Sequence, residues 1–398
     1  MIFPEARDTL ERILSPLSLG EFLDDVLLGG VVKIPGNADC DRAQLLGKDP
    51  KRLLLEHFDY LSPRITCHGA QPLGPPPAIQ RVADPDEFEA KIGEFHSLGY
   101  TVRLPDLRSV APDLDLFSRA LEFFLHKPVE AAAVFWSRGD AKAPIHYDEY
   151  DLIVIQIEGA KRWFISDSQS ALPNTWKGLA EEPPVLDPYS VIEVGPGDLL
   201  FIPRGTPHRV DALETSIHIS IGFVPLTVRD AIIATIDHLS DLDKSLRETV
   251  GSRLAFSVRR NDFGDLGQSI RSGVSSLAAH CGSNAFIAQA LQRRSSRVIG
   301  DLGKLTVTRP LPDVSIDTRV RHGSGAICHL ISNAQMIDFS YPGGHIYIHR
   351  GVEESVTFVA ETPEFRVRDI PGMVGDDVRI ALVGRFISAG FLVVAEDG

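Results

Sequence analysis

Residues 197–208 read GDLLFIPRGTPH, and this stretch gives the clearest indication of the fold. Four consecutive apolar residues, 199–202, are typical of a buried β-strand. The Pro/Gly-rich turn that follows them carries a histidine, His208. We therefore expect a central strand, followed by a turn that places His208 at the rim of a sheet.

Similar short strands lie on both sides of this stretch, between residues 131 and 224. Gly/Pro turns separate them, a pattern typical of a β-sandwich or barrel. A small antiparallel barrel has a mouth in which a metal ion and a ligand can fit. The predicted strands are residues 131–136, 152–157, 162–165, 191–194, 199–202 and 216–224.

His146 and Asp148 are separated by a single residue, Tyr147. On a strand, side chains two positions apart point to the same face, so both would point into the barrel. Together with His208 they would form a 2-His-1-carboxylate set, which binds Fe(II) on one face and leaves the opposite face open. Each motif also has a simpler interpretation: a surface histidine near a solvated aspartate, and a turn histidine bonded to backbone.

Lys161 follows the turn at Glu158-Gly159 and begins the next predicted strand. An iron oxygenase that uses 2-oxoglutarate needs a cation for the distal carboxylate of this cosubstrate, and a lysine supplies a point charge suited to it. Strand alternation places Arg162 on the other face. An exposed Lys161 paired with Glu158 is the alternative.

These elements together resemble the JmjC-type 2-oxoglutarate oxygenases, and within them the ribosomal oxygenase group. The similarity lies in the segments HYDE (146–149), VIQIEGAKRW (154–163), PRGTPH (203–208) and SIHIS (216–220). It covers about a hundred residues closely, whereas the flanking regions match by layout. Ala131-Ala132-Ala133 departs from the family, which often has a polar residue there, and residues 137–144 are more charged than usual.

The resemblance implies a function and a set of site residues. His146, Asp148 and His208 would bind Fe(II), and 2-oxoglutarate would chelate the iron with its distal carboxylate on Lys161. Ser220 and Ser137 are further candidates for hydrogen bonds to that carboxylate, and O2 would take the remaining metal position. The family hydroxylates arginine or histidine side chains of ribosomal proteins. His218 is expected to line the barrel without binding the metal.

The flanking regions predict further domains. Residues 18–28 are predicted to form a helix with a capping box, residues 31–34 a strand and residues 114–125 an amphipathic helix. Residues 228–239, 242–250 and 283–294 are also predicted helices. A hairpin (336–349), two helices (353–360 and 376–389) and a strand (391–395) suggest a winged helix. The predicted fold is mixed α and β: a double-stranded β-helix (cupin/JmjC jelly-roll barrel) at 1–225, a helical dimerisation domain at 226–300 and a winged-helix-like domain at 301–398.

The composition suits an acidic globular protein. The net charge of −14 argues against binding to nucleic acid and favours a basic partner such as a ribosomal protein. The predicted final helix has few cations, which also argues against DNA reading. Four scattered cysteines, no long apolar run and no signal-like N-terminus predict a cytoplasmic protein without membrane spans, and helix pairs favour a homodimer.

Three other interpretations remain open at this point. An oxygenase of a small molecule or a biosynthetic peptide would share the same barrel and differ only at its entrance. Hydroxylation of an N-methyl group would make the protein a demethylase. A non-catalytic cupin-like protein could use its C-terminal domain to bind a partner. Glu149, Asp151 and Asp211 form an acidic cluster that could receive a cationic substrate side chain or simply face solvent.

Overall fold

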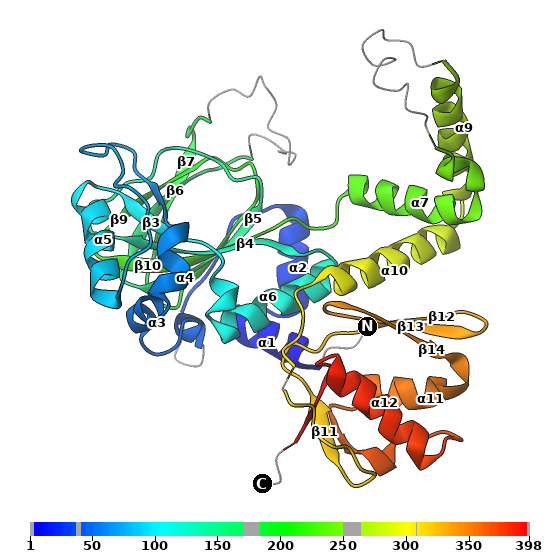
Figure 1. Ribbon diagram of the computed structural model, residues 1–398. Helices are drawn as coiled ribbons and strands as arrows, with labels where there is room; N and C mark the ends of the chain where they lie inside the picture. Colours follow the sequence, from blue (N-terminus) through cyan, green and yellow to red (C-terminus); the bar gives the residue numbers. More distant parts are fainter. Residues whose placement is uncertain (1–3, 37–40, 170–183, 250–263, 308, 396–398) are drawn as a thin grey trace. The chain divides into compact units, whose positions relative to one another are not determined.

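The computed structural model describes residues 4–36, 41–169, 184–249, 264–307 and 309–395 (Figure 1). The chain divides into two compact units, one ending at Pro225 and the other beginning at Leu226. Within the described residues, no helix combines the length and the apolarity that crossing a membrane requires. The three-domain division stays a prediction, since residues 226–300 and 301–398 fall within one unit.

The first unit is built around two antiparallel sheets. The larger has the strand order β1-β8-β5-β10-β4-β3-β2, and the smaller has the order β7-β6-β9. The strands are β1 Val32–Ile34, β2 Thr66–His68, β3 Thr101–Leu104, β4 Val129–Ser137, β5 Asp151–Glu158, β6 Lys161–Ser166, β7 Tyr189–Val194, β8 Leu199–Ile202, β9 His208–Ala212 and β10 Ser216–Phe223. Six strands predicted between residues 131 and 224, and the one predicted at 31–34, are confirmed within a residue or two at most ends.

Helices cover the larger sheet of this unit. They are α1 Pro4–Leu14, α2 Leu19–Leu28, α3 Pro50–Glu56, α4 Phe58–Leu61, α5 Pro85–Ser97 and α6 Pro112–Leu125. Helix α5 packs on β3 and α6 on β4, as Figure 1 shows. The predicted capping box is confirmed, because Ser18 Oγ accepts from the Glu21 amide and Glu21 accepts from the Ser18 amide. The helix predicted at 114–125 is also confirmed.

Gly159 sets the turn between β5 and β6. Its φ of +61° lies in the left-handed region, and a Cβ there would lie 2.2 Å from the Thr215 carbonyl oxygen. Only glycine fits such a position without a backbone shift. The turn thereby fixes where β6 starts, and the first residue of β6 is Lys161.

Among its described residues, the second unit contains three long helices, α7 Val228–Leu242, α9 Gly264–His280 and α10 Asn284–Asp301. Its further elements are β11 Arg319–His322, β12 His329–Ser332, β13 Met336–Tyr341, β14 Gly344–His349, α11 Glu353–Glu361, β15 Glu364–Arg366, α12 Asp376–Ser388 and β16 Leu392–Val394. The strands form two sheets, β15-β11-β16 and β12-β13-β14. The hairpin, both short helices and the last strand are confirmed, and one apolar core joins α11 and α12 to these sheets.

The helix predicted at 242–250 is wrong. Helix α7 continues to Leu242, where Asp243 leaves the helical region and caps a short 3-10 turn, Lys244–Arg247, by accepting from the Ser245 amide. Val250 lies outside the described residues. An aspartate that bonds a backbone amide two residues ahead competes with a continuing helix. The helix predicted at 283–294 exists, with Ser283 as its N-cap, but extends to Asp301.

Candidate metal centre

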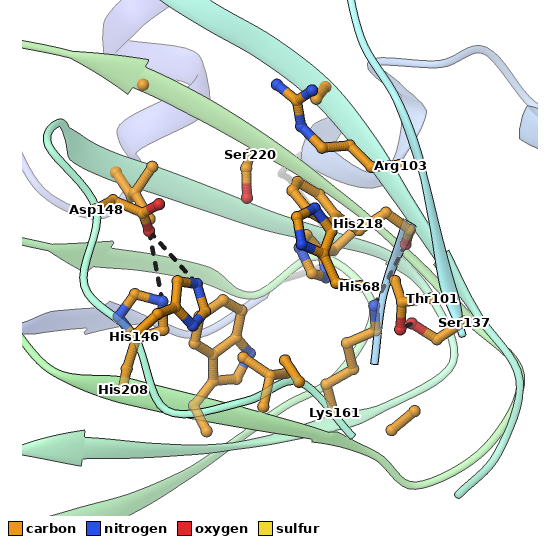
Figure 2. Close-up of a pocket in the computed structure, with 18 of the residues that line it drawn as sticks. His68, Thr101, Arg103, Ser137, His146, Asp148, Lys161, His208, His218 and Ser220 are labelled. Atoms are coloured by element: carbon orange, nitrogen blue, oxygen red, sulfur yellow. Dashed lines mark hydrogen bonds and ion pairs between the residues drawn. The ribbon is translucent and has the colours of Figure 1, made fainter. Parts of the chain in front are cut away.

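His146, Asp148 and His208 converge on one point of the first unit. One ligand atom from each residue lies within 4.8 Å of the other two. An Asp148 carboxylate oxygen is 3.5 Å from Nε2 of His208 and 4.0 Å from Nε2 of His146, and Figure 2 shows all three side chains facing one another. Two imidazoles and one carboxylate grouped on one side are a set suited to Fe(II) with open positions.

The backbone of residues 145–149 differs from the prediction. His146 and Asp148 lie in irregular chain outside the named strands, although His146 forms an isolated bridge with His208. The two amide–carbonyl bonds of this bridge are 3.0 and 2.8 Å long. His208 is the first residue of β9 and only 2% exposed, so its predicted place in a turn at the rim is also wrong. The bridge brings the two motifs together without a regular strand at His146.

Backbone carbonyls set the tautomer of both imidazoles. Nδ1 of His146 lies 2.9 Å from the Pro144 carbonyl, and Nδ1 of His208 lies 3.0 Å from the Thr206 carbonyl. In the neutral rings Nδ1 therefore donates, which leaves the lone pair of Nε2 free for a metal. Burial, followed by the nearby His146, lowers the pKa of His208 to about 4. A neutral ring is the form that binds a metal ion.

The triad opens into a cavity of about 290 Å³ between the two sheets. The larger sheet contributes residues from β2, β3, β4, β5 and β10, and the smaller sheet contributes Lys161, Trp163 and three residues of β9. Most of the lining is apolar or small. The lining residues are His68, Thr101, Arg103, Ala131, Ala133, Phe135, Ser137, Ala141, Ala143, His146, Asp148, Tyr150, Leu152, Lys161, Trp163, His208, Val210, Ala212, His218, Ser220 and Gly222.

Lys161 lies in this cavity, 1% exposed. Its Nζ bonds the Phe135 carbonyl at 3.3 Å, and burial lowers its pKa to about 7. Its alternative pairing with Glu158 is wrong, because Glu158 pairs with Lys51 at 3.2 Å. A buried ammonium without a carboxylate favours the uptake of an anion.

The two serines predicted beside the cosubstrate both line the cavity. Ser137 shares a hydrogen bond of 2.9 Å with Thr101, and Figure 2 shows this pair next to Lys161. In the same view Ser220 lies between Asp148 and His218. Arg162 lies on the outer face with Glu193, as strand alternation predicts. The roles of Ser137 and Ser220 as hydrogen-bond donors to the cosubstrate stay predictions.

Sequence reasoning missed three polar residues of the cavity, His68, Thr101 and Arg103. They come from β2 and β3, short strands that precede every recognised motif. The sequence did predict that His218 lines the barrel. His218 packs between Phe135 and Trp163, with ring centroids 4.9 and 5.6 Å away, and its Nδ1 has no partner within the described chain.

The acidic cluster that could receive a cationic substrate side chain does not line this cavity. Asp151 is buried and accepts from the Arg204 amide at 2.7 Å, and Asp211 lies 3.3 Å from Nε of Arg209. Glu149 is also absent from the lining. Asp148 is consequently the one acidic side chain among the described residues that face the cavity.

Residues 110–231 match the family model of the JmjC domain. The chain is 34% identical over 99 residues to the ribosomal protein uL16 3-hydroxylase of Escherichia coli, covering 24% of this chain and 25% of that protein. It is 22% identical over 262 residues to the bifunctional lysine-specific demethylase and histidyl-hydroxylase NO66 of Drosophila pseudoobscura pseudoobscura, covering 61% and 27%. The matches thus span well under half of these relatives.

Solved structures share the fold along nearly the whole chain. The ribosomal oxygenase YcfD of Escherichia coli has a TM-score of 0.54 at 16% identity, covering 95% of this chain and 98% of that one. A structure of YcfD with cobalt and 2-oxoglutarate gives 0.54 at 15% identity, covering 96% and 99%. The mixed α/β architecture with a cupin-like core is therefore confirmed.

Proposed function

We propose that this chain, whose residues 110–231 match the JmjC domain and which is similar to the ribosomal oxygenases, is an Fe(II)- and 2-oxoglutarate-dependent dioxygenase. It hydroxylates a side chain of a protein, and a basic ribosomal protein is the leading candidate. The observation that carries the proposal is one cavity with a His-His-Asp set on one side and, on the other, a buried lysine that pairs with no carboxylate among the described residues.

The residues that line the cavity have separate binding roles. His146, Asp148 and His208 would hold the metal ion, while Lys161 would bind the distal carboxylate of the cosubstrate. Iron(II) with 2-oxoglutarate and O2 supplies the oxidation that converts a substrate C–H into C–OH, with release of succinate and CO2. The hydroxyls of Ser137 and Ser220 would donate to the cosubstrate carboxylate, and the apolar walls of the cavity would exclude water.

The substrate is tested directly on ribosomal proteins. The net charge of −14 favours encounter with a basic protein. Ribosomal proteins from the source organism, incubated with the enzyme, iron and 2-oxoglutarate, are expected to include one whose mass rises by one oxygen atom. Intact-mass spectrometry measures this, with 2-oxoglutarate omitted as the control. If no ribosomal protein gains oxygen while the enzyme turns over another compound, the substrate is a small molecule or a biosynthetic peptide.

Cosubstrate affinity is expected to fall as the pH rises above 7. The free protein holds Lys161 with a pKa of about 7, and a bound carboxylate raises that pKa because it favours the charged form. Between the two values, binding takes up about one proton. Calorimetry of N-oxalylglycine binding to the Mn(II)-loaded protein, in buffers of different ionisation enthalpy, measures the uptake. A pH-independent affinity between pH 7 and 9 would contradict it.

The helical segment 226–300 is proposed to form a homodimer. Apolar side chains on its helices lie exposed to solvent, among them Val228 at 78% and Val274 at 59%. Such side chains on helices are typical of a symmetric interface. Sedimentation equilibrium is expected to give twice the chain mass, and Val274→Glu is expected to shift it toward the monomer. A wild-type monomer at micromolar concentration would contradict this.

The C-terminal segment 301–398 is proposed to be a winged-helix-like domain that does not read DNA. Helix α12 carries two arginines against two acidic residues in its first turn. A helix that reads DNA carries more cations than this. We further propose that the protein is cytoplasmic, because its scattered cysteines suit a reducing compartment.

A further inference from the structure

Two cationic side chains line the cavity, Lys161 and Arg103. The proposed function uses Lys161 but gives no role to Arg103. Within the described part of the chain, the side chain of Arg103 forms neither a hydrogen bond nor an ion pair. Its guanidinium lies 5.9 Å from the centre of the Phe135 ring. A cation held in a cavity without a counter-ion favours an anion from outside.

Arg103 lies away from both the triad and Lys161. Thr101, two residues earlier on β3, lies at the Lys161 end beside Ser137. Figure 2 shows Arg103 reaching to the side of Ser220 and His218 that faces away from Lys161. The charge of Arg103 also contributes, after burial and His146, to lowering the pKa of His68. Arg103 therefore belongs to a part of the cavity that the cosubstrate carboxylate on Lys161 would not fill.

Small residues make room beside Arg103. On the larger sheet Arg103 pairs with Phe135, and Ala133 lies two residues further along the same face of β4. Ala131 follows on the same face and pairs with Gly222 of β10. These three small residues line the cavity. A Cβ on Gly222 would lie 3.1 Å from the Tyr150 ring, so a glycine at this position allows the ring to pack closely against the backbone of β10.

The charges of the cavity disfavour a cationic substrate group. Asp148 supplies the one negative side chain among the described lining residues, and it belongs to the metal set. A guanidinium or ammonium from a substrate would meet Arg103 with no carboxylate of the protein to offset the repulsion. A carboxylate would instead form a charge-assisted and potentially bidentate pair.

We propose that Arg103 binds a carboxylate of the substrate, placed next to the carbon that is hydroxylated. This inference rests on the proposed function and narrows its substrate: the modified site carries an acidic side chain or a free acid group nearby, and it is not an arginine. A ribosomal protein that is basic as a whole satisfies this when the segment entering the cavity is acidic. A small carboxylic acid offers the same chemistry.

The test uses the full chain loaded with Mn(II) and N-oxalylglycine, an inert stand-in for 2-oxoglutarate. The immobilised protein is offered three pools of short random peptides that differ only in a central Asp, Asn or Arg. A fourth pool contains N-acetylated amino acids as free acids and as amides. Bound material is quantified by mass spectrometry for wild type, Arg103→Gln and Arg103→Glu. Arg52→Gln, an exposed arginine of α3 paired with Glu56, is the matched control.

Wild type and Arg52→Gln are expected to retain the Asp pool, or the free acids, about ten- to a hundredfold better than their neutral counterparts. Arg103→Gln is expected to lose that preference, and Arg103→Glu to favour the Arg pool. If the Asp peptides are retained, the substrate is a protein. If only the free acids are retained, the substrate is a small molecule. Preference of wild type for the Arg pool, no preference at all, or an unchanged preference in Arg103→Gln would overturn the proposal.

Calorimetry of N-oxalylglycine itself separates this inference from the proposed function. Arg103→Gln is expected to bind N-oxalylglycine within about twofold of wild type. A loss as large as that of a Lys161 variant would place Arg103 in the cosubstrate site and overturn the substrate role. If the wild-type protein binds no N-oxalylglycine, the proposed function fails before the question of Arg103 arises.

Discussion

Asp148→Ala is expected to abolish succinate formation, with a loss of a hundredfold or more. The variant leaves two imidazoles without the carboxylate that lies 3.5 Å from His208 and 4.0 Å from His146. Loss of groups that merely orient metal ligands already costs about ten- to a hundredfold, so loss of a ligand costs at least that much. Succinate is measured with iron, 2-oxoglutarate and the substrate supplied, and bound iron is measured in parallel.

Asp211→Asn is the matched control for this prediction. Asp211 belongs to β9, as His208 does, but pairs with Arg209 outside the cavity. Its variant is expected to bind iron and produce succinate as wild type does. Equal iron binding by wild type and Asp148→Ala would remove the triad from the mechanism, even if turnover fell.

Lys161→Met is expected to weaken N-oxalylglycine binding by about ten- to a hundredfold and to stabilise the ligand-free protein. The loss follows from removal of the cation that pairs with the distal carboxylate. The gain follows because burial lowers the pKa of Lys161 from 10.5 to about 7. The unfolded chain therefore binds this proton more tightly than the folded chain does. At neutral pH this difference lowers the free energy of unfolding by an amount on the order of a few kcal/mol.

The effect of Lys161 on the free energy of unfolding is expected to depend on pH. Between pH 7 and 10.5 the unfolded lysine is protonated while the folded one is largely neutral, so the free energy of unfolding of the ligand-free protein rises with pH in this window. Lys161→Met is expected to lack that rise, and Lys51→Met, an exposed lysine paired with Glu158, to keep it. Chemical denaturation at several pH values measures both. A destabilised Lys161→Met protein would show that the buried ammonium already has a counter-ion.

Much of the candidate site follows from local sequence. The apolar runs between Gly/Pro turns predict the strands of the barrel, because each run alternates with residues that only a turn accommodates. The convergence of His146, Asp148 and His208 is foreseen from metal chemistry. The place of Lys161 follows from a glycine turn directly before a strand, and φ at Gly159 explains why that turn is fixed.

The errors arise where tertiary contacts override local patterns. The backbone at His146 and Asp148 is irregular, since its bonds go to His208 rather than along a continuous ladder. Strand β3 has only four residues, and no pattern in them shows that Arg103 faces the cavity. The acidic residues near the motifs suggested a cationic substrate, but Asp151 turns to the Arg204 amide instead. Which way a side chain turns depends on packing partners distant in sequence.

Anaerobic calorimetry of Fe(II), followed by 2-oxoglutarate, tests the central claim most directly. Wild type is expected to bind one ferrous ion per chain, and 2-oxoglutarate is expected to bind tightly only once the metal is present. His208→Ala is expected to lose both events, since its ring supplies one of the three ligand atoms. Tight 2-oxoglutarate binding without metal, or wild-type iron binding by His208→Ala, would contradict the account.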